Sequence, residues 1–166
     1  MPFSNSNKPA FYALTMPVAG DRPLFEKVEA ANTIITALQA LRAGGSIFLY
    51  AFAVMPDHLK LLVAPKGGST VRDMLYSLRR NIGQALSGKG LKGTVWTPKS
   101  EIQKVFESVD ARALARTIEG AAVDAGMVED PRAYLFASAH PDHQVDALPE
   151  TAPATVAHPL AVPATA

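Results

Sequence analysis

Residues 51–63 read Ala51-Phe52-Ala53-Val54-Met55-Pro56-Asp57-His58-Leu59-Lys60-Leu61-Leu62-Val63, and this stretch decides how the chain folds. It belongs to two apolar runs, 47–54 and 58–64, which predict two consecutive buried strands. The link over 55–57 predicts a tight connection or a bulge, because proline removes a hydrogen-bond donor from a strand ladder.

The second of these strands carries an unusual polar pair. Side chains alternate across a strand, so His58 and Lys60 point to the same face. Two histidines at this spacing would let one cation bind both imidazoles, but here the second position holds a lysine. A protonated ammonium group has no lone pair to offer a metal. The strand therefore has the pattern of a metal site that has lost a ligand.

The rest of the chain supplies further strands and helices. Expected elements are a strand over Ala10–Met16, a helix over Leu24–Leu41, a helix opened by Ser69–Asp73, an edge strand over Ile102–Phe106, a helix over Val109–Ala125 and a short strand or coil over Tyr134–Ala137. The helices are indicated by apolar residues at helical spacing and by a plausible cap. The order β, α, β, β, α, β, α predicts an α+β fold, a ferredoxin-like antiparallel sheet with helices packed mainly on one face.

Composition bounds the domain organisation. A chain of 166 residues, 48% of them apolar, is enough for one domain with a real core. We expect a loose arm over 1–9, the domain over 10–140 and a disordered tail over 141–166, since the tail has five prolines, seven alanines and no lysine, arginine or aromatic residue. The absence of cysteine excludes disulfides, and the lack of an apolar signal core or spanning run predicts a cytoplasmic location.

Positive charge is concentrated in the middle of the chain. Between Lys66 and Lys104 there are eight basic and two acidic residues, an excess of six positive charges, although the whole chain has a net charge of +1. Such a segment suits binding to a polyanion. A solvated surface with chance clustering is the alternative reading, and charge alone leaves both open.

Five segments together resemble the IS200-like, single-tyrosine transposases of the REP-associated kind. The resemblance runs from about Phe11 to His140, and each segment keeps its order and spacing. They are the first strand over 11–15, the turn over 21–25, the stretch Met55-Pro56-Asp57-His58, the Val95-Trp96 segment followed by Glu101-Ile102, and the ending from Ala125-Gly126-Met127-Val128 through Tyr134 and Ser138.

The resemblance implies a catalytic centre that this chain has largely lost. In the family, two histidines and one amide side chain hold Mg or Mn, which polarises the scissile phosphate, and a tyrosine on the last helix attacks it. Where the family has the second histidine, this chain has Lys60. Thr117 stands at the tyrosine position and Ala121 at the amide position. Only His58 of these four reactive positions is kept, so we expect no metal cofactor here.

The candidate functional residues have competing interpretations. His58 is a relic metal ligand or, as we favour, a histidine satisfied by hydrogen bonds. Glu119 could bind a metal together with His58, but it lies two residues before Ala121, the position of the missing amide ligand. Trp96 could stack on a base, but we favour packing. The DNA contacts implied by charge and resemblance are Lys60, Arg72, Arg79, Arg80, Lys89, Lys92 and Lys99. Each could instead lie on a solvated surface.

Three functions follow from these observations. The leading hypothesis is a DNA-binding protein derived from an IS200-like transposase, which holds single-stranded or hairpin DNA without nicking and joining it. The second is an active transposase or nuclease with rearranged catalytic residues. The third is a folded remnant that serves as an interaction module without binding DNA. The sequence leaves open whether the protein is a monomer or a homodimer.

Overall fold

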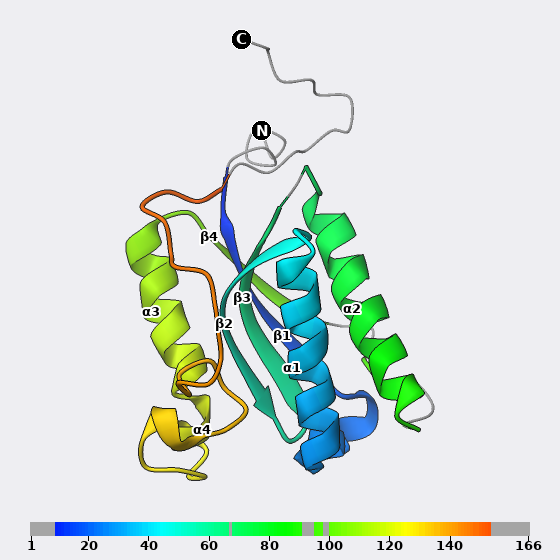
Figure 1. Cartoon of the computed structure of the whole chain (residues 1–166). Helices are drawn as coiled ribbons and strands as arrows, with labels where there is room; N and C mark the ends of the chain where they lie inside the picture. The colour runs from blue at the N-terminus through cyan, green and yellow to red at the C-terminus, as the bar shows by residue number, and fades with distance from the viewer. Residues whose placement is uncertain (1–8, 67, 91–94, 98–99, 154–166) are drawn as a thin grey trace.

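A four-stranded antiparallel sheet runs through the middle of the described molecule (Figure 1). The computed structural model describes residues 9–66, 68–90, 95–97 and 100–153. The strands are β1 (Phe11–Pro17), β2 (Ile47–Met55), β3 (His58–Pro65) and β4 (Glu101–Val105), in the order β2-β3-β1-β4. With a helix after β1 and another after β3, this is the ferredoxin-like βαββαβ arrangement, so the expected α+β fold is confirmed.

The link between β2 and β3 is a tight turn. Met55 pairs with His58, which leaves Pro56 and Asp57 as a two-residue connection. Both carbonyl groups of the turn are held from outside, since Val18 N donates to Asp57 O at 2.9 Å and Phe25 N donates to Pro56 O at 2.9 Å. The proline therefore sits where no ladder donor is needed. A register shift that the sequence did not predict lies further back, between Leu49 and Ala51.

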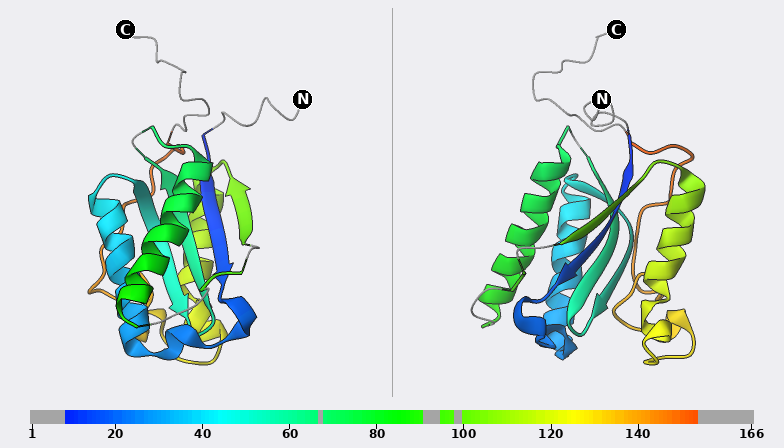
Figure 2. Two further views of the ribbon diagram at one scale, coloured as in Figure 1. Left: turned by 90° about the vertical axis from the view of Figure 1, so that its right-hand side faces the viewer. Right: turned by 180° about the vertical axis from the view of Figure 1, so that it is seen from behind.

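The two longest helices cover one face of the sheet, as the sequence predicts (Figure 2). α1 (Val28–Ala43) buries Ala30, Ala31, Ile34, Ile35, Leu38 and Leu41, and α2 (Val71–Gly88) buries Met74, Leu78, Ile82 and Leu86. A capping box between Thr70 and Asp73 fixes the start of α2. The helix expected from Leu24 begins later, because a 3-10 turn occupies Leu24–Glu26 and Lys27 is extended.

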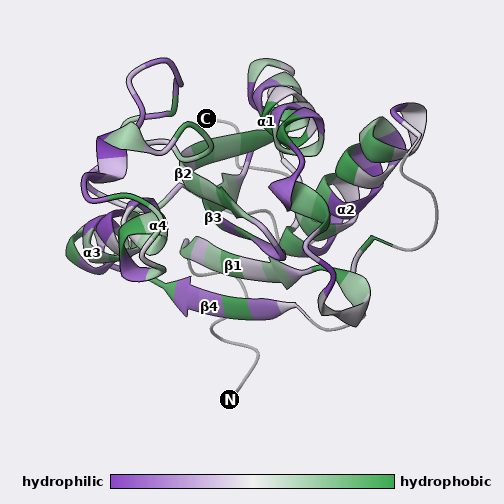
Figure 3. Cartoon of the chain, turned by 90° about the horizontal axis from the view of Figure 1, so that it is seen from below, coloured by the Kyte–Doolittle hydropathy of each residue, from purple (hydrophilic) through white to green (hydrophobic). Residues whose placement is uncertain are grey.

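The opposite face is also covered, so the helices form two layers around the sheet (Figure 3). α3 (Ser108–Glu119) and α4 (Ala121–Asp124) lie there, together with the later part of the chain. β2 and β3 are buried almost along their whole length, which is the physical reason for a second layer. The single helix expected over 109–125 is divided at Gly120, a residue with low helix propensity.

The segment after α4 runs along the free edge of β2. A 3-10 turn at Pro131–Ala133 precedes it. Val54 N donates to Phe136 O at 2.8 Å, Ser138 N donates to Phe52 O at 2.9 Å, and Asp146 N donates to Leu49 O at 2.7 Å. Composition predicts a disordered tail from Pro141, and within residues 141–153 the structure gives Asp146 a backbone partner on β2, because an edge strand offers unpaired backbone groups that composition does not reveal.

Two segments for which the sequence predicts a loose arm or a disordered tail lie outside the described residues. They are the remainder of the tail, 154–166, and most of the arm, 1–8. Within the described part, no helix is long and apolar enough to cross a membrane.

Candidate nucleic-acid interface

The two residues that the sequence singles out on β3 face the α3 layer. Leu59, Leu61 and Val63 belong to the core beneath α1 and α2, whereas Leu62 and Ala64 belong to the cluster that packs against α3 and α4. By strand alternation His58 and Lys60 share the face of Leu62. The hypothetical catalytic face is therefore opposite the face that α1 and α2 cover.

Lys60 and Thr117 line one pocket of about 310 Å³. The strands supply the floor and α3 supplies the wall; the lining residues are Ala13, Leu14, Thr15, Lys60, Glu101, Ile102, Gln103, Leu114, Thr117 and Ile118. We call this cavity the Lys60–Thr117 pocket. Lys60 and Thr117 are two of the four positions that the resemblance marks as reactive, and both line this pocket.

Strand register sets the polar floor of the pocket. Thr15 on β1 pairs with Lys60 on β3 and with Glu101 on β4. The Lys60 ammonium, the Thr15 hydroxyl and the Glu101 carboxylate thus belong to one row across three strands. Gln103 follows two residues after Glu101 on β4. Thr15, Glu101 and Gln103 are not among the functional residues predicted from the sequence. Side-chain alternation along β1 and β4 indicates which residues share a face. It identifies these three as neighbours of Lys60 only when the strand pairing is known.

The remaining reactive positions lie outside that lining. Ala121 is buried in the cluster beneath α4. His58 Nδ1 lies 2.7 Å from Asp57 Oδ1, so the favoured interpretation of a hydrogen-bonded histidine has a partner in the structure. Thr117 Oγ1 donates to Ala113 O at 3.1 Å within its own helix.

These groups do not fit a divalent metal. An ammonium and a methyl group stand where the resemblance places two ligands, and hard cations want several oxygen or nitrogen donors. Among the described residues, no three His, Cys, Asp or Glu side chains are grouped to hold a metal ion. The Glu119 carboxylate is engaged elsewhere, since Ser138 Oγ donates to Glu119 Oε2 at 2.7 Å while accepting from Phe52 N at 2.9 Å.

No tyrosine takes over the place of Thr117 in the lining of the pocket. Tyr12 is buried in the core beneath α1 and α2, and Tyr76 is on α2, across the sheet. Tyr134 OH donates to Val54 O at 2.7 Å, and burial raises the pKa of Tyr134. The pKa of Tyr50 is raised as well, by burial and by the nearby Asp146 carboxylate. High pKa values disfavour the phenolate that a nucleophile would need.

The predicted basic residues are not gathered around the Lys60–Thr117 pocket. Arg72, Arg79 and Arg80 lie on α2, across the sheet, and Lys89 follows the end of α2. Lys92 and Lys99 lie outside the described residues. Arg79 connects α2 to the strand that borders the pocket, because its Nη2 donates to Ser100 Oγ at 2.5 Å. Ser100 directly precedes Glu101, which lines the pocket.

Trp96 has a packing role in the structure. Its ring meets Phe25 edge to face with centroids 5.6 Å apart, and the residue pairs with Val18 in an isolated bridge. It packs against the core beneath α1 and α2. The indole N–H is buried and finds no hydrogen-bond partner among the described groups. Packing, rather than stacking on a base, accounts for these contacts.

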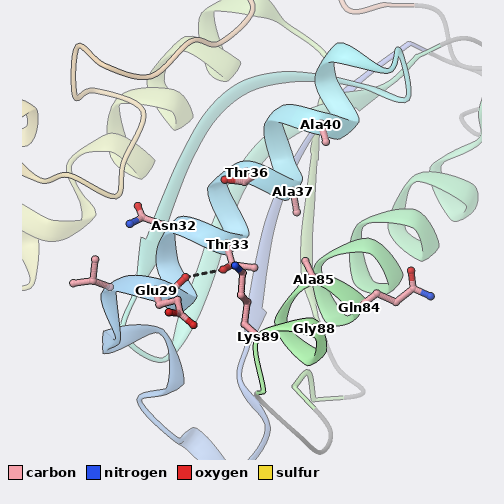
Figure 4. A pocket seen from close by; sticks show the side chains of 11 residues that line it. Glu29, Asn32, Thr33, Thr36, Ala37, Ala40, Gln84, Ala85, Gly88 and Lys89 are labelled. Carbon is pink, nitrogen blue, oxygen red and sulfur yellow. Dashed lines mark hydrogen bonds between the residues drawn. The ribbon is translucent and has the colours of Figure 1, made fainter.

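A larger groove of about 870 Å³ separates α1 from α2 (Figure 4). Small side chains such as Ala37, Ala40 and Ala85 line it, together with polar side chains at its rim. The hydroxyl of Thr33 is occupied, since it donates to Glu29 O at 2.7 Å. The groove lies on the face away from the Lys60–Thr117 pocket and contains no cluster of charged groups suited to a phosphate.

The arrangement of strands and helices matches a known transposase. The structure of a REP-associated tyrosine transposase bound to a REP hairpin aligns with a TM-score of 0.66, at 18% identity, over 81% of this chain and 79% of that one. The chain has the fold of a REP-associated tyrosine transposase. The fold that the sequence resemblance implies is thereby confirmed.

Other comparisons add less. A Deinococcus radiodurans R1 protein described as a transposase aligns at 19% identity over 64% of this chain and 87% of that one, with a TM-score of 0.49. No protein-family model matches the chain, and no curated protein matches it.

Proposed function

We propose that this protein is a DNA-binding member of the IS200-like transposase family that holds single-stranded or hairpin DNA without nicking or joining it. The transposase fold and the five sequence segments support the family. The proposed loss of nicking and joining rests on the Lys60–Thr117 pocket. There an ammonium group and a threonine occupy positions where the family resemblance implies a metal ligand and a tyrosine. The REP hairpin held by the similar structure is the model for the ligand.

In this proposal Lys60 binds a DNA phosphate at the base of the pocket. An ammonium group attracts phosphate as a point charge and donates charge-assisted hydrogen bonds. Thr15 and Gln103 offer further donors along the same floor, while Glu101 repels a phosphate that moves too far toward β4. The pocket therefore positions one phosphate beside Lys60.

Bond cleavage does not follow from this binding. The threonine hydroxyl is a poorer nucleophile and a poorer leaving group than a phenol, and Thr117 Oγ1 already donates its hydrogen bond to Ala113 O. A base positioned to activate it would have to come from the pocket, where Glu101 is the acidic group. The lining contains no tyrosine and no histidine. These contacts favour binding over the alternative of rearranged catalysis.

The test measures binding and cleavage on the same DNA. Fluorescence anisotropy with a labelled single-stranded hairpin is followed over a salt series for the wild-type protein, Lys60→Gln and the control Lys27→Gln, which removes an exposed charge at the start of α1. We expect salt-sensitive binding that weakens in Lys60→Gln and stays unchanged in Lys27→Gln. Loss of one phosphate contact lowers the slope of log affinity against log salt by about 0.7 on a single strand.

Cleavage is followed on denaturing gels with Mg or Mn. We expect neither nicking nor a covalent adduct from the wild-type protein. The combined restoration Lys60→His, Thr117→Tyr and Ala121→Asn gives the complementary measurement, and any adduct that it forms must depend on the new tyrosine. A wild-type adduct, or the absence of salt-sensitive DNA binding, contradicts the proposed function.

A further inference from the structure

The outer surface of α2 presents an exposed aromatic ring among arginines. Tyr76 is 64% exposed, and Arg72 and Arg80 are exposed at the positions four residues before and after it. Residues three and four apart are neighbours on a helix surface, so Arg79 also borders the ring on one side. We call these four residues the Tyr76 platform. Its arginines are among the DNA contacts predicted from the sequence, but the tyrosine is not.

The helix that carries the platform is packed in one orientation. Met74, Leu78, Ile82 and Leu86 are buried on the opposite side of α2, which fixes the rotation of the helix about its axis. Asp73 is the acidic residue of α2, and its carboxylate accepts from Thr70 N in the capping box. Arg79 is oriented by its hydrogen bond to Ser100. The backbone positions of the four residues are therefore set by the packing of α2, and the Arg79 side chain is held by Ser100.

Arg79 of the platform is linked to the Lys60–Thr117 pocket at the edge of the sheet, through Ser100. Figure 2 shows α2 on one face, α3 on the other and β4 at the edge between them. Arg79 contacts Ser100, and the next residue, Glu101, lines the pocket. Glu101, Ile102 and Gln103 of β4 are exposed. A nucleic-acid strand that leaves the pocket around β4 passes from Glu101 toward Arg79 on α2.

We propose that the Tyr76 platform stacks an unpaired base of the bound DNA while Arg72 and Arg80 hold the adjacent phosphates. The inference rests on the proposed function and specifies a second contact for the same single-stranded ligand. Aromatic rings stack on any base, and the positive charge favours a polyanion over an apolar protein partner. The occupant is thus a single-stranded segment beside the hairpin rather than the duplex itself.

The first experiment separates stacking from charge. Binding of an oligothymidine and of a hairpin with a single-stranded extension is measured for Tyr76→Ala, Tyr76→Phe and the doubly substituted Arg72→Ala/Arg80→Ala. We expect Tyr76→Ala to lose roughly fivefold or more in affinity at an unchanged salt slope, and Tyr76→Phe to bind like wild type. The double arginine variant should lower the slope by about 1.4. Leu135→Ala, which trims an exposed apolar side chain away from α2, is the matched control and should change nothing.

The second experiment asks whether a base is needed. An extension with abasic sites should bind the wild-type protein and Tyr76→Ala equally, because there is no base left to stack. An equal loss for Tyr76→Ala on normal and abasic DNA would mean a structural role and overturn the inference. Salt-sensitive binding that is unaffected by Tyr76→Ala would overturn it while leaving the proposed function standing. No DNA binding by the wild-type protein would overturn both.

Discussion

Replacing Asp146 with alanine should release the chain segment that covers the edge of β2. The Asp146 carboxylate accepts from Leu49 N at 2.9 Å and from Arg42 Nε at 3.2 Å, and the two charged side chains are about a quarter exposed. Leaving a partly buried backbone N–H without its partner costs about 1–3 kcal/mol. The ion pair adds up to about 1 kcal/mol. We therefore expect a loss of about 1–4 kcal/mol in the free energy of unfolding.

Urea unfolding followed by far-UV circular dichroism measures this loss, and two further variants divide it. Asp146→Asn keeps an acceptor for Leu49 N and removes only the charge, so it should cost no more than about 1 kcal/mol. Asp142→Ala, whose side chain is 83% exposed, is the control and should stay within about 0.5 kcal/mol of wild type. If Asp146→Ala is as stable as the control, the segment contributes no net stability and the reasoning is refuted.

Other predictions concern the capping box and the buried phenols. Thr70→Ala should lower the stability by about 1 kcal/mol, seen in the same urea titration, because Asp73 N loses its acceptor at the start of α2; Ser69→Ala is the control. Tyr134→Phe should cost about 1 kcal/mol at neutral pH through loss of the bond to Val54 O. Burial raises the pKa of Tyr134 and of Tyr50, so their contribution is complete below the ordinary tyrosine pKa and is lost as the pH rises above it. Unfolding midpoints should fall on the alkaline side and fall less in Tyr134→Phe; an unchanged alkaline limb would contradict this assignment.

Local patterns predicted most of the sheet and helices. The apolar runs around Pro56-Asp57 predicted the β2–β3 hairpin, because strand length, alternation and a proline-containing link are all local signals. The break at Gly120 and the register shift after Leu49 were not predicted. Both are small adjustments by which a helix or strand fits the surface it packs against, and that surface is known only in three dimensions.

The roles of the site residues stay predictions, whereas their places in the fold are known. Lys60 and Thr117, which the resemblance marks as reactive positions, line the same pocket. The charge-rich middle of the sequence was expected to make one surface, but the α2 arginines lie across the sheet from Lys60. Closeness along the chain does not decide which side of a sheet a helix covers. The contact of Asp146 with β2 was not predicted for a related reason, since its partner is a backbone group of a distant strand.

The two edges of the sheet differ in a way that limits self-association. Residues 136–146 occupy the hydrogen-bonding groups of β2, whereas β4 is the other edge and is largely exposed in the part of the chain that the structure describes. In the terms of polymer chemistry, the folded domain is monofunctional, because β4 is the one sheet edge of the described residues that is open to pairing with another copy. Two copies that join through β4 leave no second end for a third copy, so strand-to-strand growth terminates at a pair instead of continuing into a fibre.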